Sequence, residues 1–381
     1  MKIICATNMP YAEEAFSRLG EVQVLAPSEI TPAAVHDAEI MAIRSTTKVN
    51  RDLLEGSRVR FVGTATIGTD HMDKDYLDAA GITWCSAAGC NANSVTEYTI
   101  TAILCMTQAQ GRPLAGRTLG IIGIGNIGSR LVRKAAALGL RVLQNDPPLA
   151  EATGDRIFRP LDEILPQADI VTLHVPLNGD GPHPTRQMAN RDFFAKMKRG
   201  AIFINAARGA LLESQALLAA LDQGQLDRVA LDTWEGEPAF RNDVLNQASI
   251  ATPHIAGHSF EGKAMGTLMV YQAACRHLGR EPDWNYEHLL PEPPVPELTL
   301  PEGDPEKLLH LATTGVYNIM VDDQRMRELA GLPEADRAAG FERLRQKYPM
   351  RREFRYTRIT NKNLDPQLRE QLTGLEFRLD G

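Results

Sequence analysis

Short apolar runs alternate with stretches of helical spacing in the first 92 residues of this 381-residue chain. Tyr11–Leu19 has the spacing of an amphipathic helix, and four runs have the composition of strands: Ile3-Ile4, Val22–Leu25, Ile40–Ile43 and Val59–Val62. Because strands that alternate with helices usually pair in parallel, this pattern predicts a parallel sheet covered by helices.

A second and longer α/β series begins at Leu119. A helix over residues 95–108 is expected just before it, with Ser94-Val-Thr-Glu97 as a capping box that satisfies free backbone donors. Six strands are predicted near residues 119–124, 141–145, 169–175, 201–205, 229–232 and 249–252. Six strands separated by helical segments is the number found in a full dinucleotide-binding fold.

The pattern changes after residue 254. Glu261–Leu278 has helical spacing and is expected to return to the first domain, and Pro291-Glu-Pro-Pro-Val-Pro296 predicts a stiff linker. The tail is richer in charge and carries a basic cluster: Arg343, Arg345, Lys347, Arg351, Arg352, Arg355 and Arg358. We therefore expect a substrate-binding domain from residues 1–92 and 256–280, a dinucleotide-binding domain over 93–255, and a linker with a C-terminal domain over 281–381.

Composition narrows the class of protein. A hydrophobic fraction of 43% and a charged fraction of 23% are typical of globular proteins. The net charge of −7 argues against a nucleic-acid partner. The five cysteines form no disulfide or zinc pattern, and no run is long enough for a signal peptide or a membrane span. We expect a cytosolic protein with no metal site and no membrane or nucleic-acid partner.

A glycine loop, Gly123-Ile-Gly125-Asn-Ile-Gly128, follows the first predicted strand of the second series. In a dinucleotide site the first glycine allows a tight turn, the second lets the backbone approach the pyrophosphate, and the third permits close packing. Asp146, at the end of the next strand, is suited to ribose hydroxyls and would repel a 2′-phosphate. The loop predicts NAD rather than NADP as cofactor, although glycines also mark ordinary turns.

Three polar residues, Arg208, Glu237 and His254, each lie just past an apolar run that follows this loop. If these runs are parallel strands of one sheet, the side chains converge at its carboxyl edge, where open α/β sheets bind ligands. Arginine suits a carboxylate, and imidazole supported by a carboxylate suits proton transfer. Taken singly, Arg208 could be a surface ion-pair residue and His254 a structural histidine, and Glu235 competes as the histidine's partner.

Several segments in this order resemble the D-isomer-specific 2-hydroxyacid dehydrogenases. They are the glycine loop, Asp169-Ile-Val-Thr-Leu-His-Val-Pro176, Gly200-Ala-Ile-Phe-Ile-Asn-Ala-Ala-Arg208-Gly209 and Thr252-Pro-His254. The resemblance implies an NAD-dependent oxidoreductase in which Arg208, Glu237 and His254 are catalytic. It also implies a Rossmann NAD-binding domain inserted in a flavodoxin-like substrate (lid) domain, followed by a C-terminal α+β dimerisation domain.

Further stretches resemble one branch of that family: Asn8-Met-Pro-Tyr-Ala12, Thr64–His71, Gly89–Ala92, Trp234–Pro238, His254–Gly257 and Phe341–Phe354. This likeness implies oxidation of 4-phospho-D-erythronate in vitamin B6 biosynthesis by a homodimer. By the same likeness, Ser45, Thr66 and position 258 contact substrate. The branch usually has tyrosine where this chain has His258, and an acidic residue where it has Thr7. The NAD site would be lined by Asn126, Ile127, Asp146, Ala206, Ala207, Arg208, Asp232 and Gly257.

A phosphorylated substrate needs a phosphate site, and Arg44-Ser45-Thr46-Thr47 offers a cation and hydroxyls at a strand end. The same residues could form an ordinary capped turn. The basic cluster of the tail could instead reach a neighbouring subunit's active site, or be a solvated face. Two other functions stay open: a related dehydrogenase acting on 3-phosphoglycerate or glycerate, and a non-catalytic NAD-sensing interaction protein.

Overall fold

The computed structural model describes residues 1–361 and 363–380, which form two compact units. Unit 1 comprises Met1–Ala92 and His258–Glu292, and unit 2 comprises residues 93–257 and 293–380. Both units are built on parallel sheets with helices on their faces, which confirms the predicted α/β fold class.

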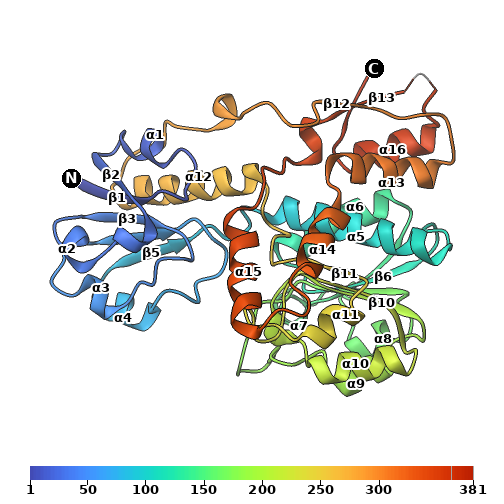
Figure 1. Ribbon diagram of the computed structural model, residues 1–381. Helices are drawn as coiled ribbons and strands as arrows, with labels where there is room; N and C mark the ends of the chain where they lie inside the picture. The colour runs from blue at the N-terminus through green and yellow to red at the C-terminus, as the bar shows by residue number, and fades with distance from the viewer. Residues whose placement is uncertain (362, 381) are drawn as a thin grey trace. The chain divides into compact units, whose positions relative to one another are not determined.

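Unit 1 is a five-stranded parallel sheet in the order β2-β1-β3-β4-β5. The first face of the sheet packs on α1 and α12 and the second on α2, α3 and α4 (Figure 1). The strands are β1 (Lys2–Ala6), β2 (Glu21–Leu25), β3 (Ile40–Ile43), β4 (Phe61–Thr64) and β5 (Thr83–Ser86). The helices are α1 (Ala12–Phe16), α2 (Pro32–Val35), α3 (Arg51–Leu54), α4 (Lys74–Ala79) and α12 (Phe260–His277).

Unit 2 contains a six-stranded parallel sheet in the order β11-β10-β9-β8-β6-β7. Four of its strands are apolar runs that are buried along their whole length, as a sheet covered on both faces requires. The strands are β6 (Thr118–Ile122), β7 (Arg141–Asn145), β8 (Ile170–Leu173), β9 (Ala201–Asn205), β10 (Leu226–Leu231) and β11 (Ile250–Ala251). The helices are α5 (Ala92–Gln110), α6 (Asn126–Ala137), α7 (Pro147–Thr153), α8 (Leu161–Ile164), α9 (Arg191–Lys196), α10 (Ser214–Asp222) and α11 (Asn242–Gln247).

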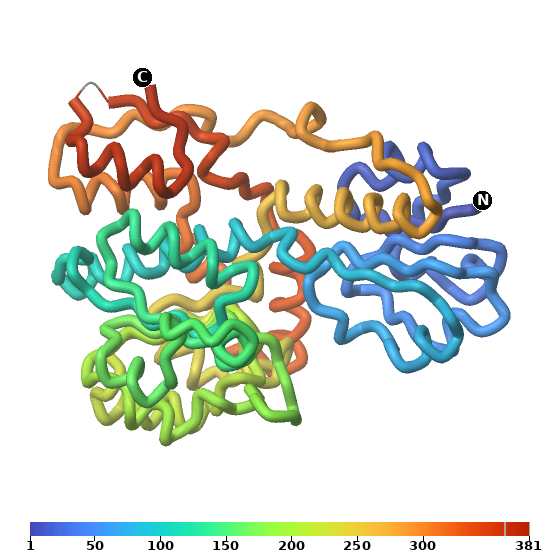
Figure 2. The backbone as a smooth tube through the Cα atoms, turned by 180° about the vertical axis from the view of Figure 1, so that it is seen from behind, coloured from blue at the N-terminus to red at the C-terminus, as the bar shows by residue number. Residues whose placement is uncertain are grey.

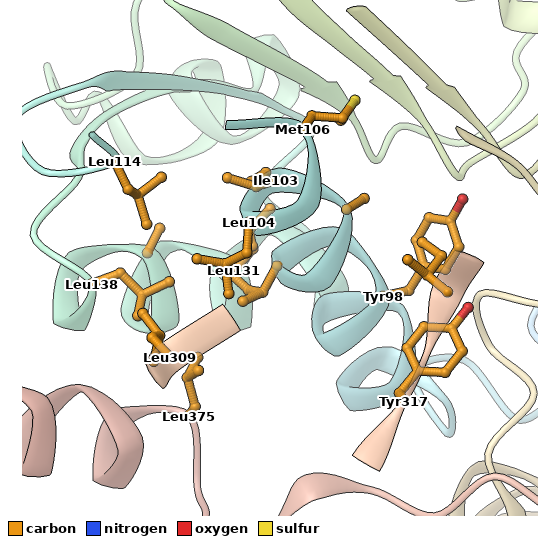
Figure 3. Close-up of a cluster of buried hydrophobic side chains, with 14 of the residues drawn as sticks. Tyr98, Ile103, Leu104, Met106, Leu114, Leu131, Leu138, Leu309, Tyr317 and Leu375 are labelled. Carbon is orange, nitrogen blue, oxygen red and sulfur yellow. The ribbon is translucent and has the colours of Figure 1, made fainter. Parts of the chain in front are cut away.

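The C-terminal domain of unit 2 has its own small parallel sheet, in the order β12-β13-β14. It shares a hydrophobic core with α5 and α6, where Leu309 and Leu375 pack beside Leu104 and Leu131 (Figure 3). Figure 2, which views the molecule from behind, shows the same domain lying against α5 and α6. Its elements are β12 (Glu297–Thr299), α13 (Pro305–Val316), α14 (Ile319–Arg327), α15 (Glu334–Gln346), β13 (Arg358–Thr360), α16 (Pro366–Gly374) and β14 (Arg378–Leu379).

The predicted capping box at Ser94 is wrong. Helix α5 begins two residues earlier, at Ala92, so Ser94 and Glu97 lie inside the helix. Their side chains bind the C-terminal domain instead: Ser94 Oγ donates to Glu353 Oε1, and Glu97 Oε1 accepts from the amide of Phe354. Both residues are fully buried, so tertiary contacts rather than helix capping account for this polar pattern.

Of the helices in the described part of the chain, none combines the length and the hydropathy that a membrane span requires.

Candidate active site

The strand ends of unit 2 place most of the predicted site residues along one edge of its sheet. The glycine loop follows β6 and Asp146 follows β7, while Arg208, Glu237 and His254 follow β9, β10 and β11. Because the strands are parallel and these last three are neighbours, the loops that carry the three residues emerge at the same carboxyl edge.

Glu237 and His254 are in direct contact. Nδ1 of His254 lies 2.5 Å from Oε1 of Glu237. Glu235, the competing partner, is engaged elsewhere, because its Oε2 accepts from the amide of Ser214 and its Oε1 contacts the amide nitrogen of the Gln187 side chain. The structure therefore pairs the imidazole with Glu237 and not with Glu235.

Glu237 is held in its ionised form. Burial opposes ionisation, but the hydrogen bond and the charge of His254 outweigh it, and the pKa of the Glu237 carboxyl lies below its usual value. The amide of Trp234 and the charge of Arg345 act in the same direction. Since an ionised carboxylate can only accept, Nδ1 of His254 carries the shared hydrogen, and in the neutral imidazole Nε2 is then the acceptor.

The turn that carries His254 is anchored by Asp232. His254 has a left-handed backbone (φ 56°), and its amide donates to the carbonyl oxygen of Asp232. The Asp232 carboxylate, 1% exposed, accepts from Thr252 Oγ1 at 2.6 Å and from the amides of Ile255 and Ala256. Asp232 thus fixes the conformation of the 252–256 turn. The sequence predicted it as an NAD contact.

Trp234 braces both members of the pair. Its backbone amide donates to Oε2 of Glu237 at 3.0 Å, and its indole Nε1 donates to the carbonyl oxygen of Thr252 at 2.9 Å. The side chain is buried, 2% exposed. Sequence patterns assigned this residue no role in the site, although it begins the Trp234–Pro238 stretch that resembles one branch of the family.

Arg208 lies beside the Trp234 loop because the next residue is glycine. A Cβ atom on Gly209 would lie 1.9 Å from the carbonyl oxygen of Trp234, so any side chain there would force the two loops apart. Asn205 fixes the other side of the loop, with its side-chain oxygen accepting from the amide of Ala207 and its nitrogen donating to the carbonyl of Arg208. Arg208 Nη1 donates to the carbonyl of Ala207, and the side chain is half-buried.

The glycine loop has the shape that a dinucleotide requires. Gly123 has φ +95°, and a Cβ atom there would meet the backbone of His174 at 2.7 Å. A Cβ atom on Gly128 would lie 2.0 Å from the carbonyl oxygen of Gly123, whereas one on Gly125 would enter open space. That space lies at the N-terminus of α6, where free amides and the helix dipole favour a phosphate.

Other residues of the loop also fit NAD. Asn126 and Ile127 open α6, and Asp146 Oδ2 accepts from the amide of Ile124 at 2.8 Å, so this carboxylate holds the loop in place. His174 Nδ1 is buried without a hydrogen-bond partner in the described part of the chain, and burial lowers the pKa of His174 to about 3. A neutral polar atom left unpaired beside the loop can form a hydrogen bond to a bound cofactor.

The remaining candidates divide between the units. Ala206 and Ala207 directly follow β9, and Gly257 ends the first segment of unit 2. The substrate candidates belong to unit 1: Arg44 and Ser45 follow β3, Thr66 lies two residues past the neighbouring β4, and His258 precedes the cap of α12. Thr66 Oγ1 already contacts Thr64 Oγ1 and the carbonyl of Gly68.

The basic cluster of the tail is partly internal. Arg351 and Arg352 are 5% and 3% exposed, and Arg351 Nη2 donates to the carbonyl of Ser94 while its guanidinium covers the Tyr317 ring. Arg345, another member of the cluster, helps to lower the pKa of Glu237 through its charge.

Aromatic packing of helix α15 places Arg345 within electrostatic range of Glu237. The Phe341 and Phe240 ring centroids are 5.7 Å apart, and Phe240 packs on Trp234 at 5.4 Å. Arg345, one turn further along the helix, lies over the Phe341 ring. The C-terminal domain therefore contacts the loop that carries Glu237.

Comparison with known proteins agrees with this geometry. Residues 96–256 match the family described as D-isomer specific 2-hydroxyacid dehydrogenase, NAD binding domain, and residues 289–375 match a domain of unknown function (DUF3410). The chain is 46% identical to erythronate-4-phosphate dehydrogenase of Cronobacter sakazakii, over 93% of this chain and 92% of that protein. It is 44% identical to the protein of the same name from Escherichia coli strain Crooks, again over 93% of this chain and 92% of that protein.

A solved structure shows the same fold. The NAD⁺-bound 3-phosphoglycerate dehydrogenase of Entamoeba histolytica aligns with a TM-score of 0.63 at 21% identity, over 73% of this chain and 95% of that one. The protein is an NAD-dependent oxidoreductase. The chain belongs to the erythronate-4-phosphate dehydrogenase family, within the D-isomer specific 2-hydroxyacid dehydrogenases.

Proposed function

We propose that this enzyme oxidises 4-phospho-D-erythronate at C2, giving 2-oxo-3-hydroxy-4-phosphobutanoate in the biosynthesis of pyridoxal 5′-phosphate (vitamin B6). The names of the relatives at 44% and 46% identity support the substrate. The contact between His254 Nδ1 and Glu237 Oε1 supports the chemistry, because it leaves Nε2 free to take a proton.

In this proposal His254 is the general base. Its Nε2 removes the proton of the C2 hydroxyl, and the imidazolium that results is stabilised by the ionised Glu237. NAD supplies the nicotinamide that accepts the hydride. Trp234 and Asp232 hold the two catalytic side chains in position, so that little reorganisation accompanies proton transfer.

In the same proposal, Arg208 binds the substrate carboxylate and the C2 oxygen. Its planar guanidinium can bind the substrate carboxylate in a two-point contact and stabilise charge on the C2 oxygen. Its fixed loop beside Trp234 keeps this cation at the same sheet edge as His254. The proposed NAD contacts are Gly123, Gly125, Asn126, Ile127, Gly128, Asp146, Ala206, Ala207, Arg208, Asp232 and Gly257, and the proposed substrate contacts in unit 1 are Arg44, Ser45, Thr66 and His258.

The test is the substrate dependence of NADH formation by the purified protein. The value of kcat/KM should be highest for 4-phospho-D-erythronate, and lower for 3-phosphoglycerate and D-glycerate. A higher value for 3-phosphoglycerate would assign the enzyme to that related reaction. The absence of NADH formation with any 2-hydroxy acid would leave an NAD-sensing role instead.

We also propose that the protein is a cytosolic homodimer formed through the C-terminal domain. Five large apolar side chains of that domain are exposed: Leu311, Met320, Val321, Leu332 and Met350. Exposed apolar groups of this kind favour association with a second copy. Light scattering on the eluting protein should give twice the monomer mass, and a variant with Met320→Asp and Val321→Asp should give the monomer mass.

A further inference from the structure

Arg44 carries a charge for which unit 1 provides no counter-ion. Its Nη1 atom is buried and has no hydrogen-bond partner among the described residues, and no carboxylate forms an ion pair with the guanidinium there. Burial lowers the pKa of Arg44, and the charge-favouring effect among the described residues comes from the thiol of Cys90, a weak acid. A cation with a buried and unpaired nitrogen is costly, so its retention calls for a reason.

Lys263 is a second cation of unit 1, and its side chain is partly buried. It lies in the first turn of α12, which is capped by Ser259, and burial followed by the charge of Arg44 lowers the pKa of its ammonium to about 8. Neither a hydrogen bond nor an ion pair involves its side chain within residues 1–361 and 363–380. Two like charges therefore influence each other in a partly buried place.

Local packing explains how the two cations meet. Arg44 directly follows β3, and β4 lies next to β3 in the sheet. Helix α12 packs on β4 and β5, and its two glycines allow a very close approach. A Cβ atom on Gly262 would lie 2.9 Å from Asn91, and one on Gly266 would lie 2.9 Å from the carbonyl of Ala65. The first turn of α12 is thereby drawn to the carboxyl edge of this sheet, where Arg44 emerges.

A buried cation elsewhere in the chain is treated differently. Lys134, 3% exposed, forms an ion pair with Glu376 at 2.9 Å and contacts the carbonyl of Leu375. The fold therefore supplies a partner for this structural cation. Arg44 and Lys263 lack such a partner, and Ser45, which follows Arg44 in the chain, is exposed.

We propose that Arg44 and Lys263 together form a two-cation anion site in unit 1, and that this site binds the phosphate group of the substrate. The inference rests on the proposed function for the identity of that substrate. A phosphate monoester carries close to two negative charges at neutral pH, which two cations match, whereas a carboxylate carries one. Lysine acts as a point charge and arginine as a two-point donor, so the pair can bind several phosphate oxygens.

The test compares substrates with and without the phosphate. We define selectivity as kcat/KM for 4-phospho-D-erythronate divided by kcat/KM for D-erythronate. Lys263→Gln should lower this ratio by on the order of 10- to 100-fold, because a hydrogen-bonded charge contact is lost. Lys263→Arg should restore most of it, and the double variant with Arg44→Gln should lower it further. Lys74→Gln, which removes an exposed lysine of α4 in the same unit, is the matched control.

A second measurement does not depend on turnover. Inorganic phosphate, compared with chloride at equal ionic strength, should raise the unfolding temperature of the wild-type protein and of Lys74→Gln. It should not raise that of Lys263→Gln. Equal loss of activity on both substrates, together with an unchanged phosphate effect on unfolding, would mean a structural role and overturn the proposal.

The two proposals fail in different ways. If the wild-type enzyme prefers another phosphorylated hydroxy acid, the proposed substrate is wrong, but Lys263→Gln must still lower the preference for the phosphorylated form of that acid. If the wild-type enzyme prefers 4-phospho-D-erythronate and Lys263→Gln keeps the full selectivity, the proposed function stands and the two-cation site is refuted.

Discussion

The indole nitrogen of Trp234 lies 2.9 Å from the carbonyl oxygen of Thr252, two residues before the catalytic histidine of our proposal. The backbone amide of the same tryptophan donates to Glu237. One residue thus connects the loop after β10 with the loop after β11. The distance between the base and its carboxylate depends on this connection, since each lies on a different loop.

Trp234→Phe removes the indole donor and keeps an aromatic ring. We expect kcat to fall by on the order of 10-fold or more, because small displacements of reacting groups are costly. The KM for NAD should change little, since Trp234 does not line the glycine loop. Trp84→Phe is the matched control: Trp84 Nε1 also donates one hydrogen bond, to Asp78, but in unit 1. Similar losses in both variants would refute the bracing role.

The variants Glu237→Gln and Glu235→Gln distinguish the roles of two carboxylates that lie on one loop. Glutamine at 237 cannot stabilise an imidazolium, so kcat should fall by ~10²–10⁴-fold, the range for general-base assistance. Glu235→Gln should stay near the wild-type rate, because Glu235 contacts Ser214 and Gln187 rather than His254. Steady-state kinetics measures kcat for both variants. A larger loss in Glu235→Gln than in Glu237→Gln would make Glu235 the carboxylate that supports His254.

Arg345→Gln tests the electrostatic effect of the C-terminal domain on the pair. The charge of Arg345 helps to lower the pKa of Glu237, so its removal should raise that pKa. An NMR titration of the carboxyl group would show the shift, and activity should then be lost at a higher pH on the acidic side. Arg343→Gln, at an exposed position of the same helix, is the control. Equal titration curves in all three proteins would contradict the coupling.

Glu97→Gln should change how stability depends on pH. Burial, with the charge of Glu353 adding to it and nearby cations opposing it, raises the pKa of Glu97 from 4.5 to about 8. The folded state therefore holds a proton that the unfolded chain has lost, and wild-type stability declines by a few kcal/mol as pH rises from about 4.5 to 8. The glutamine variant lacks this decline.

Chemical denaturation at several pH values measures this difference. The free energy of unfolding of Glu97→Gln minus that of the wild type should grow between pH 5 and 8, at about 1.4 kcal/mol per pH unit at most. Glu370→Gln, at an exposed position, should show a constant difference. A constant difference for Glu97→Gln too would show that Glu97 is ionised in the folded protein.

Gly125→Ala and Gly128→Ala separate cofactor binding from folding. A methyl group on Gly125 enters open space at the start of α6, so the protein should fold normally while the KM for NAD rises on the order of 10-fold. A methyl group on Gly128 collides with the carbonyl of Gly123, which should cost about 1–3 kcal/mol of stability. Thermal unfolding and NAD titration of the two variants measure both effects.

Sequence patterns predicted the central sheet of unit 2 well, because its strands are unbroken apolar runs that are buried on both faces. They missed β5, a partly exposed edge strand of mixed polarity, Thr83–Ser86. They also missed the small C-terminal sheet, whose strands of two or three residues are too short to show periodicity.

The same limit holds for the site. Residues at strand ends could be named, because parallel topology alone brings Arg208, Glu237 and His254 to one edge. The bracing by Trp234 and the pairing of Arg44 with Lys263 could not be predicted from the sequence, because they depend on how separate loops and helices pack. The residue pattern alone left Glu235 as a competitor. The family resemblance favoured Glu237, and the geometry of the loop pairs Glu237 with His254.

The core shared by α5, α6 and the C-terminal domain has a consequence for how the protein is made in the cell. Leu375 and Phe377 pack in the same cluster as Leu131 of α6. During synthesis, the helix that follows the glycine loop must wait with an uncovered apolar face until these late residues leave the ribosome. The nascent NAD-binding unit is therefore exposed to aggregation and to chaperones until the C-terminal domain has been synthesised.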